Sequence, residues 1–123
     1  MMGASSGAHL SVETEDLPEG HVIHVAGEID LGNIAVLRAV LEPAVQNRQN
    51  VIMDLSRVTY LDSTTLHAIV TSDRELRTHQ CRLVVVGSPF LFKLLQIAGL
   101  QRQLNVVPSM GDARHMLVGG HVS

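Results

Sequence analysis

Three hydroxyl side chains follow an aspartate in the segment YLDSTTL, residues 60 to 66. A hydroxyl in a protein can cap a helix, act as a nucleophile beside a base, or accept a phosphate. Asp62 and Ser63 both suit a helix start, where a side-chain oxygen accepts hydrogen bonds from backbone N–H groups. A helix N-terminus also favours a phosphate, because its free N–H groups and the positive end of its dipole attract anions. The segment is therefore both a candidate cap and a candidate modification site.

A phosphate on Ser63 would strongly change the charge of this segment. Phosphoserine carries about −1.5 to −2 charges near neutral pH, and that charge would stand next to the Asp62 carboxylate. A partner surface fitted to a neutral hydroxyl would then be repelled. Ser63 is thus a candidate switch, whether or not it also caps the helix.

Other kinds of site find less support in the sequence. His67 lies one helical turn after Ser63, but no pattern supplies the orienting acid and oxyanion hole of a hydrolase. The chain has seven histidines, yet His21 and His24 are expected to point to opposite faces of a strand. No HExxH, no clustered Cys and His spacing, no GxxxxGK[ST] and no GxGxxG occurs. We expect no catalytic residue, no metal site and no cofactor.

The composition narrows the class of protein. The 123 residues suit one domain, and the 46% of hydrophobic residues, nearly all aliphatic, can form its core. The net charge of −3, without a basic stripe, argues against nucleic acid as a partner. The single Cys81 fits a reducing compartment, and we find neither a signal-peptide pattern nor a long apolar run. We expect a cytoplasmic protein without membrane insertion.

Strands and helices must position the hydroxyl side chains. The hydrophobic pattern predicts where these strands and helices lie. A first pair of strands flanks a turn at 17–20, and buried strands are expected at 51–55, 83–86 and 104–107. Helices are expected at 33–46, at 63–78, at 88–98 and from Ser109 onward. Asn33 and Ser88 are predicted caps, and Asp73 and Arg77 are assigned to the exposed face of the second helix.

The predicted order is β-β-α-β-α-β-α-β-α. Alternation of strands and helices favours an α/β domain with a mixed, mainly parallel sheet of about five strands and four helices. Residues 1–8 are expected to be a loose N-terminal segment, residues 9–118 the domain, and residues 119–123 a loose C-terminal tail.

Three segments resemble the STAS domains of bacterial anti-sigma factor antagonists. They are GEID at 27–30, DLSRVTYLDST at 54–64 and GSPFLFKLLQIAGL at 87–100, and they stand in the order and spacing of that family. The resemblance spans roughly residues 10 to 118 and implies a STAS fold without enzymatic activity. It further implies that the protein binds an anti-sigma factor, which is also a serine kinase of the histidine-kinase-like ATPase fold, and so releases a sigma factor. Phosphorylation by that kinase would break the complex, and a separate phosphatase would reset it.

The resemblance also implies roles for individual residues. By position in the motif, Ser63 is the phosphoacceptor, Asp62 is the motif aspartate, and Asp30 closes GEID near the phosphorylation site. The implied partner-binding residues are Asp30, Asp62, Thr64, Thr65 and His67. The chain departs from the family at Thr65 and His67, where glycine is usual. Since glycine lets another backbone come close, two larger side chains are expected to change the docking surface.

Two functional hypotheses from different classes stay open. The first is a regulatory switch in which Ser63 accepts a phosphate and the helix beginning there docks an ATPase-type kinase. The second is a non-phosphorylated STAS scaffold, or an accessory subunit of a signalling assembly or of a lipid ABC transporter. In that case the hydroxyls would serve as caps and contact groups. Hydrolase chemistry at Ser63 is a third idea, for which the necessary partner residues are not evident.

Overall fold

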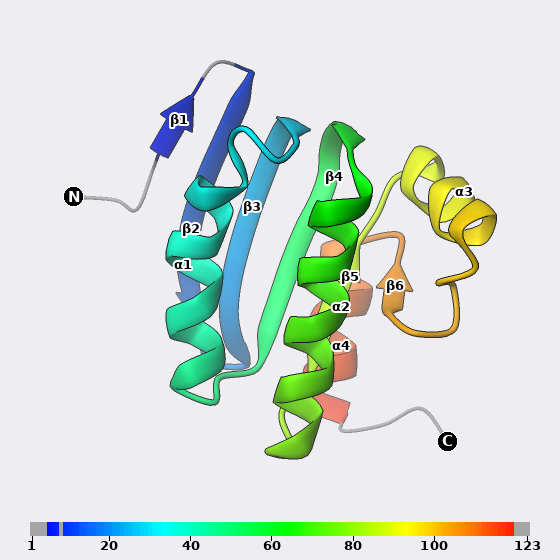
Figure 1. Cartoon of the computed structure of the whole chain (residues 1–123). Helices are drawn as coiled ribbons and strands as arrows, with labels where there is room; N and C mark the ends of the chain where they lie inside the picture. Colours follow the sequence, from blue (N-terminus) through cyan, green and yellow to red (C-terminus); the bar gives the residue numbers. More distant parts are fainter. Residues whose placement is uncertain (1–4, 8, 120–123) are drawn as a thin grey trace.

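A six-stranded sheet forms the centre of the computed structural model, which describes residues 5–7 and 9–119. The strands lie across the sheet in chain order, from β1 to β6 (Figure 1). Their bounds are β1 Ser5–Gly7, β2 Leu10–Leu17, β3 Gly20–Ile29, β4 Val51–Leu61, β5 Leu83–Val86 and β6 Asn105–Val107. β1, β2 and β3 are antiparallel neighbours, whereas β3, β4, β5 and β6 run parallel. The predicted α/β class with a mixed, mainly parallel sheet is confirmed.

Four helices cover this sheet unequally. Their bounds are α1 Ile34–Gln46, α2 Ser63–Thr78, α3 Pro89–Ala98 and α4 Met110–Gly119. α1 and α2 lie side by side on one face, α4 lies on the other, and α3 lies beside α2 at the β6 side (Figure 1). No helix in the described part of the chain is long and apolar enough to span a bilayer.

Each face of the sheet has its own apolar cluster. The larger cluster joins the sheet to α1 and α2, and its fully buried members include Leu37, Met53 and Ile69. The smaller cluster packs α4 against β3, β4 and β5, with Ile52 and Ala113 both at 0% exposure. α4 covers only part of its face of the sheet. The uncovered part of that face carries polar side chains.

β4 is much longer than the predicted strand at 51–55. Its last buried residues are Leu55, Val58 and Leu61, which are spaced by three instead of alternating. The pairing of β3 with β4 shifts register twice, between His24 and Ala26 and between Gly27 and Glu28. Such irregularities reset which side chains face the core, which explains why a prediction from the apolar run at 51–55 missed the second half of the strand.

The structure adds one strand that was not predicted, and two local expectations are wrong. Ser5–Gly7 form β1 and pair with β2, within residues 1–8, whose looseness stays a prediction. Asn33 and Ser88 occupy N-cap positions, but neither side chain makes a capping hydrogen bond. Asp73, assigned to an exposed face, is only 1% exposed. Of the expected tail at 119–123, Gly119 is the last residue of α4, and residues 120–123 lie outside the described residues.

Candidate functional site

The hydroxyl segment lies where β4 ends and α2 begins. Asp62 is the N-cap residue of α2, with an extended backbone at φ −96° and ψ 176°. Its Oδ1 accepts hydrogen bonds from the Thr65 backbone N–H and from the Thr65 hydroxyl, both at 2.9 Å. The predicted cap is therefore confirmed for Asp62, and Thr65 supplies two donors to it.

Ser63 is the first residue of α2, and its side chain is exposed. Because the Asp62 carboxylate caps the helix, the helix start does not require a hydroxyl at position 63. The Ser63 hydroxyl therefore lies at a helix N-terminus, in reach of another protein, without a capping role to maintain.

The loop after β3 is tied directly to this helix start. Asp62 Oδ2 accepts a hydrogen bond of 3.0 Å from the Leu31 backbone N–H. Within the loop, Asp30 Oδ1 accepts from the Gly32 N–H at 2.8 Å, and the Asn33 amide oxygen accepts from the Asp30 N–H at 2.9 Å. Asn33 thus orders the loop instead of capping α1. The GEID and DST motifs, separated in sequence, form one structural unit.

Both carboxylates of this unit contribute negative charge beside Ser63. Burial opposes ionisation of Asp62, but the hydrogen bonds from Thr65 and from the Leu31 N–H outweigh it and lower the pKa of this carboxyl. Asp62 is therefore an anion at neutral pH. Asp30 is exposed in the adjoining loop. A phosphate or a carboxylate at position 63 would therefore add negative charge next to the ionised Asp62.

The other proposed partner-binding residues differ in their exposure. Thr65 is fully buried, and its hydroxyl is held by Asp62. A direct contact between Thr65 and a partner was therefore a wrong expectation, since threonine here completes the cap. Thr64 is half-buried, whereas His67 is exposed one turn along α2. Of the two filled glycine positions, only His67 changes the surface.

Exposed apolar side chains lie at the same edge of the sheet as Ser63 and were not recognised in the sequence. Leu31, Tyr60 and Phe90 are exposed by 72%, 49% and 40%. They follow or end β3, β4 and β5, whose carboxyl ends meet at the same edge of the sheet as Ser63. Large apolar side chains beside carboxylates are typical of surfaces that bind proteins. The available signal was their position at, or within four residues of, the ends of strands.

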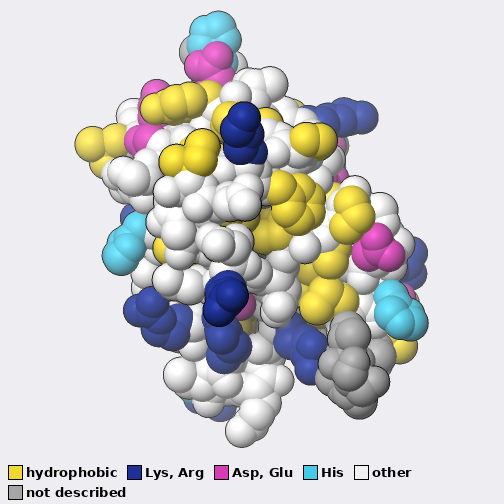
Figure 2. Space-filling view, turned by 90° about the vertical axis from the view of Figure 1, so that its right-hand side faces the viewer, with side chains coloured by type: hydrophobic (Ala, Val, Ile, Leu, Met, Phe, Trp, Pro, Cys, Tyr) yellow, Lys and Arg dark blue, Asp and Glu magenta, His cyan; other side chains and the backbone are white. Residues whose placement is uncertain are grey.

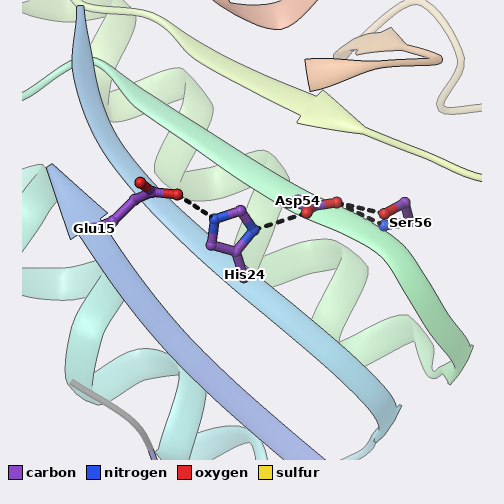
Figure 3. A network of polar contacts seen from close by, with 4 residues as sticks. All are labelled: Glu15, His24, Asp54 and Ser56. Carbon is purple, nitrogen blue, oxygen red and sulfur yellow. Dashed lines mark hydrogen bonds and ion pairs between the residues drawn. The ribbon is translucent and has the colours of Figure 1, made fainter. Parts of the chain in front are cut away.

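A second polar cluster lies on the sheet face that α4 leaves uncovered. His24 on β3 contacts Glu15 on β2 through Nε2 and Asp54 on β4 through Nδ1, each at 2.7 Å (Figure 3). Asp54 also accepts from the Ser56 hydroxyl at 2.6 Å. A carboxylate only accepts hydrogen bonds, so both contacts of the ring require the doubly protonated imidazolium. Ion pairs in this cluster therefore link β2, β3 and β4.

This cluster predicts a pH-dependent contribution to stability. Burial disfavours the charged His24 ring, but its bonds to Glu15 and Asp54 outweigh burial and raise its pKa above 6.5. Burial raises the pKa of Asp54, but bonds from Ser56 and His24 outweigh it and lower that pKa below 3.8. The Asp54 contribution is present above pH 3.8 and lost as pH falls through the lowered pKa. The His24 contribution is present below pH 6.5 and lost as pH rises through the raised pKa.

We expect His24→Gln to lower the melting temperature most between pH 4 and 6.5, with the difference from wild type shrinking toward pH 9. Thermal unfolding followed by circular dichroism across this range measures the effect. The matched control is His67→Gln on the exposed face of α2, which should keep the wild-type pH profile. A His24→Gln difference that is constant with pH would show that the ring contributes only neutral contacts.

Comparison with known proteins agrees with this geometry. Residues 11–113 match the STAS domain family model. The anti-sigma-B factor antagonist of Listeria monocytogenes is 36% identical over 108 residues, which cover 85% of this chain and 94% of that protein. An anti-sigma factor antagonist from Mycobacterium paratuberculosis has a structure with a TM-score of 0.82 at 23% identity, covering 93% of this chain and 98% of that one.

A further solved structure is that of the Bacillus cell fate determinant SpoIIAA in the phosphorylated form. It gives a TM-score of 0.64 at 23% identity and covers 83% of this chain and 95% of that chain. At such identities the two structural matches support the fold, while the family match and the Listeria relative extend over most of the sequence. The chain therefore belongs to the STAS domain family, among relatives that include anti-sigma factor antagonists.

Proposed function

We propose that this protein is an anti-sigma factor antagonist whose docking surface is the end of the sheet around Ser63. The observation that carries the proposal is an exposed serine at the first position of α2, whose helix is capped independently by Asp62. The names of the curated relatives support the same role. In this role the protein binds an anti-sigma factor serine kinase of the ATPase type, and the sigma factor is released into the cytoplasm.

Phosphorylation of Ser63 ends this interaction. The Ser63 oxygen attacks the γ-phosphorus of the kinase-bound ATP, the bond to the β-phosphate oxygen breaks, and ADP leaves. The hydroxyl proton passes to a base of the kinase, because Asp62 is already occupied by three hydrogen bonds. The product carries about two negative charges beside Asp62 and Asp30, so the partner is repelled. A phosphatase restores the hydroxyl by hydrolysis. SpoIIAA of Bacillus, which has the same fold, is described in a phosphorylated form, and this supports control by phosphorylation.

A phosphorylation assay tests the proposed phosphoacceptor. The purified protein is incubated with ATP and the ATPase-type serine kinase of the same organism, and the phosphate is located by mass spectrometry. Wild type and Thr64→Ala should each gain one phosphate, whereas Ser63→Ala should gain none. Thr64 is the matched control, because it is the neighbouring hydroxyl and is half-buried. Phosphorylation of Ser63→Ala at the wild-type rate would show that another residue is modified.

The exposed His67 favours one alternative function. At this position the family usually has glycine, and the imidazole stands one turn from Ser63 on the docking face of α2. A partner other than a kinase, such as a scaffold protein or the ATPase subunit of a lipid transporter, would account for such a change. In that case wild type and Ser63→Asp would bind the same partner equally, and no phosphate would be found on Ser63.

A further inference from the structure

A groove runs along α2 from Ser63 toward the other end of the helix. Its first part is a cavity of about 300 Å³ between α2 and the end of α3, where Ser63, Leu66 and Ala98 are among the lining residues. Its second part, of about 460 Å³, is lined by residues that include Arg77 and Arg102. Both parts share Val70, Arg74 and Gln103. The two cavities therefore form one continuous groove.

The two parts of the groove differ in chemistry. Leu66, Val70 and Leu100 give the first part an apolar wall. Arg74, Arg77 and Arg102 line the second part, and no Asp or Glu of the described residues lines it. Figure 2 looks onto this side of the molecule and shows several Lys and Arg side chains across its lower half and others near its top, with hydrophobic side chains between them. This concentration of positive charge is unusual in a chain of net charge −3.

Hydrogen bonds hold the Arg77 side chain in place, unlike the side chains of Arg74 and Arg102. The buried carboxylate of Asp73 accepts from Arg77 Nε at 2.9 Å and also from Nη2. Arg77 Nη2 donates in addition to the Gln103 carbonyl at 3.0 Å, which joins α2 to the loop before β6. Among the described residues, no ion pair engages Arg74 or Arg102, and both side chains are exposed. Two guanidinium groups thus stand ready for an acidic partner.

Ser63 and Arg74 both line the first part of the groove, but their backbones stand at different levels of α2. Eleven residues of helix separate Ser63 from Arg74, which corresponds to about 16 Å along the axis. The screening length at physiological ionic strength is about 8 Å. Arg77 and Arg102 line only the second part of the groove, so most of its positive charge lies away from Ser63.

We propose that the partner docking at Ser63 also places an acidic segment of its chain in this groove. Apolar side chains of that segment pack against the exposed Ala98 and the half-buried Leu100, and its carboxylates pair with Arg74 and Arg102. The apolar half of the groove fits a polypeptide better than a small anion, and the negative net charge of the protein disfavours a nucleic acid. The inference rests on the proposed function and adds the chemistry of the partner.

The test is a charge reversal that leaves Ser63 and Arg77 untouched. Binding of the ATPase-type kinase of the same organism, with ADP present, is measured by titration calorimetry at low and high salt. Arg74→Glu combined with Arg102→Glu should weaken binding about tenfold at low salt and reduce its salt dependence. The matched control, Arg48→Glu combined with Arg57→Glu, makes the same change in net charge at exposed positions outside the groove. It should keep the affinity within about twofold.

Two outcomes separate this inference from the proposed function. If Ser63→Asp abolishes binding while the groove double variant binds like wild type, the acidic segment is refuted and the switch stands. If Ser63→Asp itself binds like wild type, the proposed function fails. The milder pair Arg74→Gln with Arg102→Gln guards against misfolding and should give a smaller loss in the same direction. Equal melting temperatures of all variants confirm that the fold is intact.

Discussion

Replacing Ser63 with aspartate is expected to weaken binding to the kinase by about 100-fold or more, which corresponds to about 2.7 kcal/mol. The new carboxylate would stand beside ionised Asp62 and exposed Asp30, at the centre of a surface that also presents Leu31 and Tyr60. Placing like charges together in an interface costs several kcal/mol, because the partner can neither hydrate nor pair the added charge. Calorimetry with ADP at neutral pH measures the affinity directly.

Ser63→Asn is the matched control for this prediction. Asparagine has nearly the shape of aspartate without its charge, so its affinity should remain within a few-fold of wild type. If Ser63→Asn loses as much affinity as Ser63→Asp, the site responds to side-chain size and the electrostatic account is wrong. Raising the salt concentration should partly restore binding of Ser63→Asp but not change the ranking of the two variants.

Replacing Asp62 with alanine is expected to lower the free energy of unfolding by about 2–3 kcal/mol. Loss of an N-cap alone costs about 1 kcal/mol. Here the variant also leaves the fully buried Thr65 hydroxyl without its acceptor and frees the Leu31 N–H. A buried polar group without a partner adds about 1–3 kcal/mol. Urea denaturation followed by circular dichroism gives the free energy.

Two further variants test how this loss arises. Ser63→Ala removes an exposed hydroxyl next to the same cap and should change the free energy of unfolding by less than about 0.5 kcal/mol. Thr65→Val removes the buried donor, so Asp62→Ala should cost less in that background than in wild type. Equal costs in both backgrounds would show that the Thr65 hydroxyl does not couple to the cap.

The sequence predicted the helices well because their signals are local. α2 begins and ends at the predicted residues, and Gly99, with φ at 73°, ends α3 as its position suggests. The strand β4 was predicted too short because its register shifts against β3 depend on pairing with a distant segment. Asp73 was assigned to the wrong face because its burial depends on Arg77 and the loop before β6, which no local pattern specifies.

Some features of the candidate site were likewise predictable from the local sequence, and others were not. The Asp62 cap and the place of Ser63 followed from spacing alone. The burial of Thr65, the apolar side chains of Leu31 and Phe90, and the groove along α2 depend on how three separate strand ends meet. The charged cluster around His24 likewise joins residues of three strands, so single-strand reasoning about His21 and His24 could not find it.

The order of the strands in the sheet affects how the chain can fold during its synthesis. Neighbours in the sheet are also neighbours along the chain, from β1 through β6. Each new strand can therefore add to an edge that already exists, although each parallel pairing must first close a crossover that contains a helix or a loop. During synthesis, β2 to β4 can assemble while later segments are still emerging from the ribosome, so the Asp62 cap and the β3 loop meet before α3 exists.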